Sequence, residues 1–169
     1  RIVKTRKPEE VLKIAKKIES DLKPFTKREL LAGSIRRKII DKIADIDIVV
    51  IPKDKEKIKE IIGRRGKLIS SGNKKINAII DNVQIDIFFT EPKSWGAAIL
   101  SRTGPVGSSL GNRSLARSKG MILSEYGLFK RTKEGKAGKY IAGRTEKEIY
   151  QALGKTYRPP EERGLPRGN

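Results

Sequence analysis

The stretch that decides the fold runs from residue 31 to residue 52 and reads LAGSIRRKIIDKIADIDIVVIP. Residues 44–51 are rich in Ile and Val and predict a β-strand that ends at Pro52. Asp45 and Asp47 interrupt this apolar run. Because alternate side chains of a strand point to one face, the two carboxylates are expected to lie side by side. Like charges at that spacing repel each other, so the pair predicts a neighbouring cation.

A third acid stands in a second apolar strand. Asp86 lies in VQIDIFFT, residues 83–90, which is otherwise rich in Ile, Val and Phe. One interpretation is that the acids line the solvent-exposed face of an antiparallel sheet. The other is a site for Mg²⁺, which prefers carboxylate oxygens completed by water and substrate phosphates. The strand pattern alone leaves both open.

The composition narrows the chemistry. The chain has 169 residues, with 39 Lys and Arg against 20 Asp and Glu, and a net charge of +19. This excess favours nucleic acid as a partner, although a soluble or heat-adapted surface is an alternative. The absence of Cys and His excludes disulfides, thiolate ligands and imidazole catalysis. The apolar runs are too short to cross a bilayer, and no signal peptide is visible. We therefore expect an intracellular protein without a membrane partner. Its location would be the cytoplasm or nucleoid of a cell or, for a viral protein, the virion or host cytoplasm.

Glu91-Pro92 breaks the pattern and predicts a boundary between a domain of residues 1–92 and one of residues 93–169. Acidic residues become rarer after this boundary, so the second domain is the better candidate for binding a phosphate backbone. The predicted helices are 8–22, 35–38, 53–63 (ended by Gly63), 93–101 and 145–154. Thr145 and Glu148 have the spacing of an N-terminal capping box. A further, basic helix is predicted to follow a Gly-rich turn at 102–112 and to end at Gly120. The predicted strands are 29–32, 44–51, 67–73, 74–82, 83–90, 121–124, 127–131 and 140–142. Turns are predicted at Gly72-Asn73 and Asp81-Asn82, and the Pro- and Gly-rich tail, residues 157–169, is predicted to be irregular. Such an order indicates an α+β fold.

A possible phosphate site precedes the acidic pair. Gly33-Ser34 joins a predicted strand to a helix and is followed by Arg36 and Arg37. Glycine lets the backbone approach a ligand, the serine hydroxyl is a donor, and an arginine can bind two phosphate oxygens. With Asp45 only a few residues further on, this order predicts a triphosphate site beside a metal site.

These motifs together resemble a known family. GSIRR, DIDIVV and QIDIFF resemble the nucleotidyltransferase palm of the family X DNA polymerases, the group that contains DNA polymerase beta. PKSWGAAIL, RTGPVG, RSLARSKGMILSEYGLF and TEKEIYQALGKTYRPPEER are similar to the thumb of bacterial and archaeal members. The resemblance spans about residues 6–164. It implies a palm with a mixed sheet and helices on one face, then a small α+β thumb, as in the minimal viral members.

The resemblance also implies roles for residues. Asp45 and Asp47 match the pair that ligates two Mg²⁺ ions, which Mn²⁺ can replace, and Asp86 matches the carboxylate that helps activate the primer 3′-hydroxyl. The positions matching nucleotide-binding residues are Gly33, Ser34, Arg37, Thr103, Gly104 and Arg6. The positions expected to bind DNA are Arg113, Arg117, Lys119, Tyr126, Lys130 and Arg131. Tyr126 could instead be a core aromatic, and the basic cluster of Lys130, Arg131, Lys133, Lys136 and Lys139 a solvated loop. Trp95 is expected to be a packing residue.

The sequence departs from the family pattern in three places. Ser101 and Arg102 replace two aromatic residues that take part in sugar discrimination, so ribonucleotides become possible substrates. Gln84 stands where many members have an arginine beside the third carboxylate. Residues 108–111 offer Ser or Gly where an Asn is frequent.

The resemblance predicts a monomeric DNA polymerase that adds deoxynucleoside triphosphates to gapped or primer-template DNA, filling short gaps in repair. The alternative is a template-independent or ribonucleotide-using nucleotidyltransferase with the same palm. A non-catalytic, basic nucleic-acid-binding module is a third interpretation.

Overall fold

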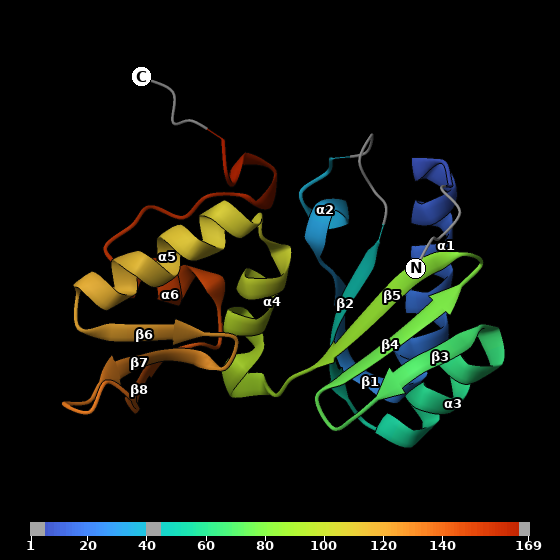
Figure 1. The fold of residues 1–169 in the computed structure, drawn as a ribbon, viewed down its shortest axis with the longest axis horizontal. Helices are drawn as coiled ribbons and strands as arrows, with labels where there is room; N and C mark the ends of the chain where they lie inside the picture. Colours follow the sequence, from blue (N-terminus) through green and yellow to red (C-terminus); the bar gives the residue numbers. More distant parts are fainter. Residues whose placement is uncertain (1–5, 40–44, 166–169) are drawn as a thin grey trace. The chain divides into compact units, whose positions relative to one another are not determined.

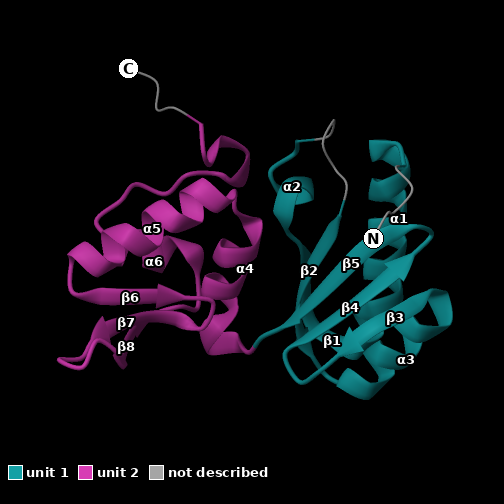
Figure 2. Ribbon diagram, viewed as in Figure 1, with its two compact units in different colours: residues 1–90 teal, residues 91–169 magenta. Residues whose placement is uncertain are grey.

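The computed structural model describes residues 6–39 and 45–165. The chain divides into two compact units, residues 1–90 and 91–169, coloured separately in Figure 2. The division lies close to the boundary predicted at residue 92. Within the described ranges, no helix is long and apolar enough to cross a membrane.

The first unit is built on a five-stranded sheet (Figure 1). Its strands, in spatial order, are β1 (Thr26–Leu31), β2 (Ile46–Pro52), β5 (Val83–Phe89), β4 (Lys75–Ile80) and β3 (Lys67–Ser71). β2 and β5 pair in parallel, whereas β1–β2, β5–β4 and β4–β3 are antiparallel. The sheet is therefore mixed, which agrees with the predicted α+β class.

Two helices cover one face of this sheet. α1 (Pro8–Leu22) and α3 (Lys55–Arg65) contribute to one apolar core with alternate residues of the central strands. The strand residues of this core include Ile46, Ile48, Val50, Ile85 and Ile87. Because side chains alternate along a strand, the residues between them, Asp47 and Asp86 among others, belong to the opposite face.

Short turns set the register of the antiparallel strands. Asp81 and Asn82 both have positive φ angles, 51° and 65°, as a two-residue type I′ hairpin turn requires. They join β4 to β5 as predicted, so that Ile80 pairs with Val83. At the other predicted turn, the Gly72 amide donates to the Lys75 carbonyl at 2.9 Å.

Helix α3 ends later than predicted. It continues through Gly63 to Arg65, and Gly66 is its C-cap. A Cβ at Gly63 would meet nothing within 4 Å, whereas one at Gly66 would collide with the Ile79 carbonyl. The glycine that the fold requires is therefore the one that touches β4. α2 (Gly33–Arg36) also begins earlier than predicted, and residue 44 of the predicted strand lies outside the described residues.

The second unit packs three helices with a small antiparallel sheet. The helices are α4 (Trp95–Thr103), α5 (Val106–Ser118) and α6 (Glu146–Ala152), and the strands are β6 (Met121–Ser124), β7 (Gly127–Arg131) and β8 (Ala137–Ala142). Three 3₁₀ turns complete the described elements: η1 (Lys23–Phe25), η3 (Pro92–Ser94) and η4 (Pro160–Glu162). Trp95 is buried, with 2% of its surface exposed, as expected for a packing residue.

The Gly-rich turn predicted at residues 102–112 is wrong for most of its length. α5 already begins at Val106, directly after Pro105, and includes Gly107 and Gly111. Asn112 of this helix is buried, and its Oδ1 accepts a hydrogen bond of 2.6 Å from Lys155. Tertiary contacts of this kind outweigh the helix penalty of two glycines, about 1 kcal/mol each.

Candidate active site

Asp47 and Asp86 are direct neighbours across the parallel pair of strands. The register of β2 and β5 pairs Asp47 with Asp86. Asp45 stands one residue before β2, not inside the strand as predicted, but two residues from Asp47. Asp86 is 9% exposed, Asp47 is half-buried and Asp45 is exposed. The fold thus brings the predicted acids to one face of the sheet, opposite α1 and α3.

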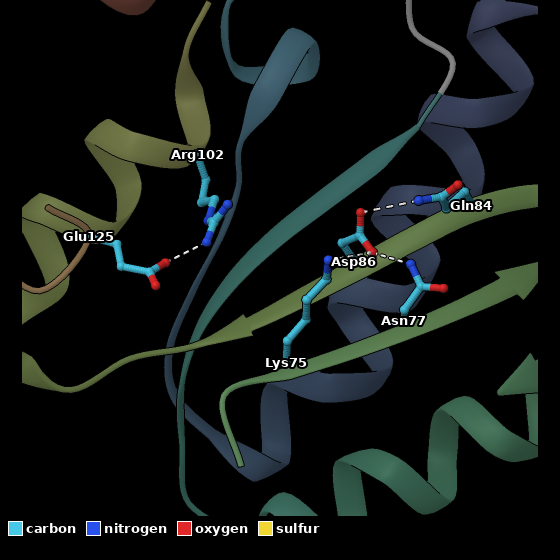
Figure 3. A network of polar contacts seen from close by, with 6 residues as sticks. All are labelled: Lys75, Asn77, Gln84, Asp86, Arg102 and Glu125. Carbon is cyan, nitrogen blue, oxygen red and sulfur yellow. Dashed lines mark hydrogen bonds and ion pairs between the residues drawn. The ribbon is translucent and has the colours of Figure 1, made fainter. Parts of the chain in front are cut away.

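Asp86 contacts three polar side chains, shown in Figure 3. The Asn77 amide of β4, directly across the strand pair, donates to its Oδ1. The ammonium of Lys75 lies 3.7 Å from the same oxygen. Gln84 Nε2 donates to Oδ2 over 3.4 Å, a long hydrogen bond. Gln84 therefore lies beside the third acid, where the sequence comparison with the family placed it.

The carboxylates influence one another electrostatically. Partial desolvation and the nearby charge of Asp86 raise the pKa of Asp45 above its ordinary value of 3.8. Both effects disfavour the charged form of Asp45. A cation on this face would reverse the second effect.

The predicted phosphate turn contacts Asp47. Gly33 has a φ of 59°, and a Cβ at this position would lie only 2.7 Å from Asp47 Oδ2. The amide of Ala32 donates to the Asp47 carbonyl at 2.8 Å. Burial lowers the pKa of the Arg37 guanidinium, and the charge of Asp47 opposes this shift. Gly33, Ser34 and Arg37 thus stand at the same end of β2 as the acids.

The donor chemistry of this face fits Mg²⁺. Among the residues described, no group of three or more His, Cys, Asp or Glu is arranged to hold a metal ion. Mg²⁺ is commonly bound through one or two carboxylates and completed by water and substrate phosphates. Asp47 and Asp86 provide such a pair beside Gly33, so metal binding stays a prediction that the side-chain chemistry supports.

Arg6 makes two contacts at the edge of the first unit. Its Nε donates to the Asp81 carbonyl in the β4–β5 turn, and its guanidinium pairs with Glu10 at 3.1 Å. These contacts join the start of α1 to the hairpin. A role in phosphate binding stays a prediction.

In the second unit, the segment predicted to line the nucleotide has its polar groups engaged. Thr103 is buried, and its hydroxyl donates to the Ile99 carbonyl one turn back in α4. Arg102 forms an ion pair with Glu125, which Figure 3 also shows. Ser101 Oγ accepts a long hydrogen bond, 3.5 Å, from Arg113. Gly104, with a φ of 65°, can offer its backbone only.

All six residues predicted to bind DNA lie on the surface. The exposed ones are Arg113, Arg117, Lys119, Tyr126, Lys130 and Arg131, together with Lys133, Lys136 and Lys139 of the basic cluster. Tyr126 is 44% exposed, so the core-aromatic interpretation is wrong. Lys119 has a structural contact as well, because its ammonium donates to the Leu153 carbonyl at the end of α6 at 2.8 Å.

Sequence reasoning missed Lys75 and Asn77, although a signal was present. The predicted Asp81-Asn82 turn fixes the register of β4 and β5, and this register places Asn77 opposite Asp86. It also missed a buried ion pair in the second unit, where Arg163 binds Glu146 at 2.7 Å. The Pro- and Gly-rich segment around Arg163 was predicted to be irregular, and no local pattern indicates its partner.

Comparisons with known proteins agree with the motifs. Residues 111–164 match the family model of the DNA polymerase beta thumb. The chain is 30% identical over 152 residues to repair DNA polymerase X of the Pretoriuskop tick isolate of African swine fever virus, covering 84% of each chain. The Badajoz strain protein of the same name is 28% identical over the same share. Rat DNA polymerase lambda is 35% identical over 86 residues, 47% of this chain and 15% of that protein. The chain belongs to family X of the DNA polymerases.

Proposed function

We propose that this repair polymerase fills short gaps by template-directed addition of deoxynucleotides to a DNA 3′-hydroxyl. The observation that carries the proposal is the juxtaposition of Asp47 with Asp86 across β2 and β5, with Gly33 in contact with Asp47. An acidic pair beside a backbone turn suited to phosphate is what nucleotidyl transfer needs. On this proposal residues 1–92 form the catalytic palm and residues 93–169 the thumb.

Different residues of the first unit would position the metal ions, the 3′-hydroxyl and the triphosphate. Asp45, Asp47 and Asp86 would hold two Mg²⁺ ions, or Mn²⁺ in their place, which neutralise charge on the transferring phosphate when bound. Asp86 would also orient the 3′-hydroxyl for attack. The backbone at Gly33 and the side chains of Ser34 and Arg37 would hold the triphosphate. Arg37 suits this role because its partly buried guanidinium is incompletely solvated.

The second unit would bind the DNA. The exposed cations on α5 and on β7, Arg113, Arg117, Lys130 and Arg131, would contact the phosphates of gapped or primer-template DNA. Tyr126, exposed at the β6–β7 turn, would approach the template and nascent pair. The protein would act as a monomer.

Extension of a one-nucleotide-gapped DNA with Mg²⁺ or Mn²⁺ tests the proposal. The wild type should insert the complementary deoxynucleotide, and Asp86→Ala should lose at least about a hundredfold in rate, the scale on which charge stabilisation at a reacting phosphate acts. Glu134→Gln, which removes an exposed acid from the β7–β8 loop, is the control and should retain full rate. Full activity in Asp86→Ala would refute the assignment.

One observation favours a second candidate, a nucleotidyltransferase that also uses ribonucleotides. Arg102, which stands in place of an aromatic ring, is ion-paired with Glu125, and Ser101 is small. Neither provides an aromatic face against the sugar. Running the gap assay with ribonucleotides and with non-complementary deoxynucleotides separates the cases. Equal use of both sugars favours the second candidate, and insertion that ignores the template base indicates a terminal transferase.

A further inference from the structure

Asp86 is flanked on the β4 side by a lysine. The antiparallel register pairs Asn77 with Asp86 and Lys75 with Phe88. Lys75 is therefore the diagonal cross-strand neighbour of Asp86 on the same face, within reach of a long side chain. Its ammonium lies 3.7 Å from Asp86 Oδ1.

The aromatic ring of Phe88 helps to fix the direction of Lys75. The lysine Nζ lies 5.3 Å from the centroid of the Phe88 ring, a cation–π distance. Asn77 donates to the same Oδ1 that faces Lys75. One oxygen of Asp86 is thus engaged by two donors from β4, one of which carries a full charge.

The opposite side of Asp86 faces acids. Asp47 is its register partner on β2, and the charge of Asp86 contributes to the raised pKa of Asp45. Lys75 is half-exposed, at 49%, so its attraction to Asp86 is screened by water and remains modest. A modest, screened ion pair is one that a divalent cation can replace.

We propose that Lys75 is a built-in counter-ion that competes with the divalent cation for Asp86. Without nucleotide, the lysine holds the carboxylate toward β4 and weakens cation binding. When the cation binds Asp86, Lys75 gives up the pair and returns to water. The inference rests on the proposed function, because it takes Asp86 as a ligand of the cation.

Cation affinity in the absence of DNA and nucleotide tests the competition directly. Mn²⁺ binding to the full chain is measured by the electron paramagnetic resonance of free Mn²⁺ at 0.1 M salt. Lys75→Met keeps the aliphatic stem on Phe88 and should bind Mn²⁺ roughly two- to fivefold more tightly than wild type, the range that a screened ion pair allows.

Lys67→Met is the matched control. Lys67 is exposed on β3, and the register places it opposite Ile79, on the same face as Lys75 but two strands from β5. It corrects for the general loss of a positive charge and should change Mn²⁺ affinity less than Lys75→Met. Asp86→Asn completes a double-mutant cycle, in which Lys75→Met should have no more effect than the control.

The outcomes separate the inference from the function on which it rests. Equal Mn²⁺ affinity in Lys75→Met and Lys67→Met, with a wild type that binds Mn²⁺ and extends gapped DNA, overturns the counter-ion role alone. An undiminished effect of Lys75→Met in the Asp86→Asn background overturns it too. A wild type that neither binds Mn²⁺ nor extends gapped DNA overturns the proposed function and the inference with it.

Discussion

Gly33 and its contact with Asp47 show how single residues define this site. The sequence identified Asp45, Asp47 and Asp86 as functional candidates because acids embedded in apolar strands are conspicuous, and Gly33 because it begins a turn between a predicted strand and a helix. It did not identify the partners of Asp86, since Lys75 and Asn77 look ordinary in a strand and acquire meaning only through the β4–β5 register. A residue's type is visible in the sequence, whereas its neighbour across a sheet is a property of the fold.

Replacing Gly33 with alanine should damage both stability and activity. The positive φ costs a non-glycine residue about 1–2 kcal/mol, and the new Cβ would lie 2.7 Å from Asp47 Oδ2. We expect Gly33→Ala to lower the free energy of unfolding by about 2 kcal/mol in urea titrations, and gap filling to fall at least about tenfold because Asp47 is displaced. Gly63→Ala, in an open helical position, should instead gain about 0.5–1 kcal/mol. Equal behaviour of the two variants would contradict this interpretation of Gly33.

We expect the charged carboxylate of Asp45 to lower the stability of the folded protein, although the proposed function requires it. Its raised pKa means that the folded state disfavours the carboxylate, a penalty present above the folded pKa and absent below the unfolded one. Asp45→Asn should therefore stabilise the protein at pH 7, by less than about 1 kcal/mol because the side chain is exposed and screened. The gain should fade as pH falls toward the ordinary value of 3.8. Thermal unfolding between pH 7 and pH 4 measures it, and a gain that grows toward acid would contradict the sign.

The observed helices and strands agree with the prediction where a hydrophobic period or a turn motif specifies them. They differ from it where tertiary contacts determine the start or end of an element. The Asp81-Asn82 hairpin and the Thr145 N-cap, which accepts from the Glu148 amide at 3.1 Å, were both predicted. The start of α5 was not, because its glycines favour a turn locally and its buried Asn112 depends on Lys155. The C-terminal segment is likewise held by Arg163, which is buried against the rings of Tyr150 and Tyr157.

Removing one partner of the buried ion pair should strongly destabilise the second unit. Arg163 and Glu146 expose 1% and 5% of their side chains, and the hydrogen bond and charge of Glu146 raise the pKa of Arg163 although burial alone would lower it. Glu146→Gln leaves a buried cation without its counter-charge, which costs about 3–5 kcal/mol. Chemical denaturation measures the loss. Glu161→Gln, on the surface, should change the free energy of unfolding by less than about 0.5 kcal/mol. If Glu161→Gln lost as much stability as Glu146→Gln, the loss would not be specific to the buried ion pair.

At the scale of the whole molecule, the charge of +19 and its weaker acidic counterweight after residue 92 could be read from the sequence, but which cations are exposed could not. The exposed cations of α5 and β7 belong to the unit that contains the thumb match, while Lys119 also contacts the end of α6. The division near residue 90 was predictable because Glu91-Pro92 interrupts a continuous apolar pattern.

Binding to gapped DNA should depend steeply on salt. Each DNA phosphate that a cation neutralises releases counterions, so log K should fall linearly with log salt. Replacing Lys130 and Arg131 together with glutamine should reduce the slope by roughly 0.9 for each phosphate that is no longer neutralised. Lys16→Gln, on the exposed side of α1, should leave the slope unchanged. Fluorescence anisotropy between 50 and 300 mM salt, a range of about sixfold chosen to resolve such slopes, measures both; an unchanged slope in the double variant would argue against DNA binding by β7.

The parallel pairing of β2 with β5 has a consequence for when Asp47 and Asp86 come together during folding. Parallel strands cannot be joined by a tight turn, and here α3, β3 and β4 all lie between the two in the chain. The β3–β4–β5 meander is local and can form early, whereas closing β2 against β5 requires a long loop to lose its entropy first. We therefore expect Asp47 to meet Asp86 late in folding. We expect the chain to bring this pair of acids together only after the β3–β4–β5 meander has formed.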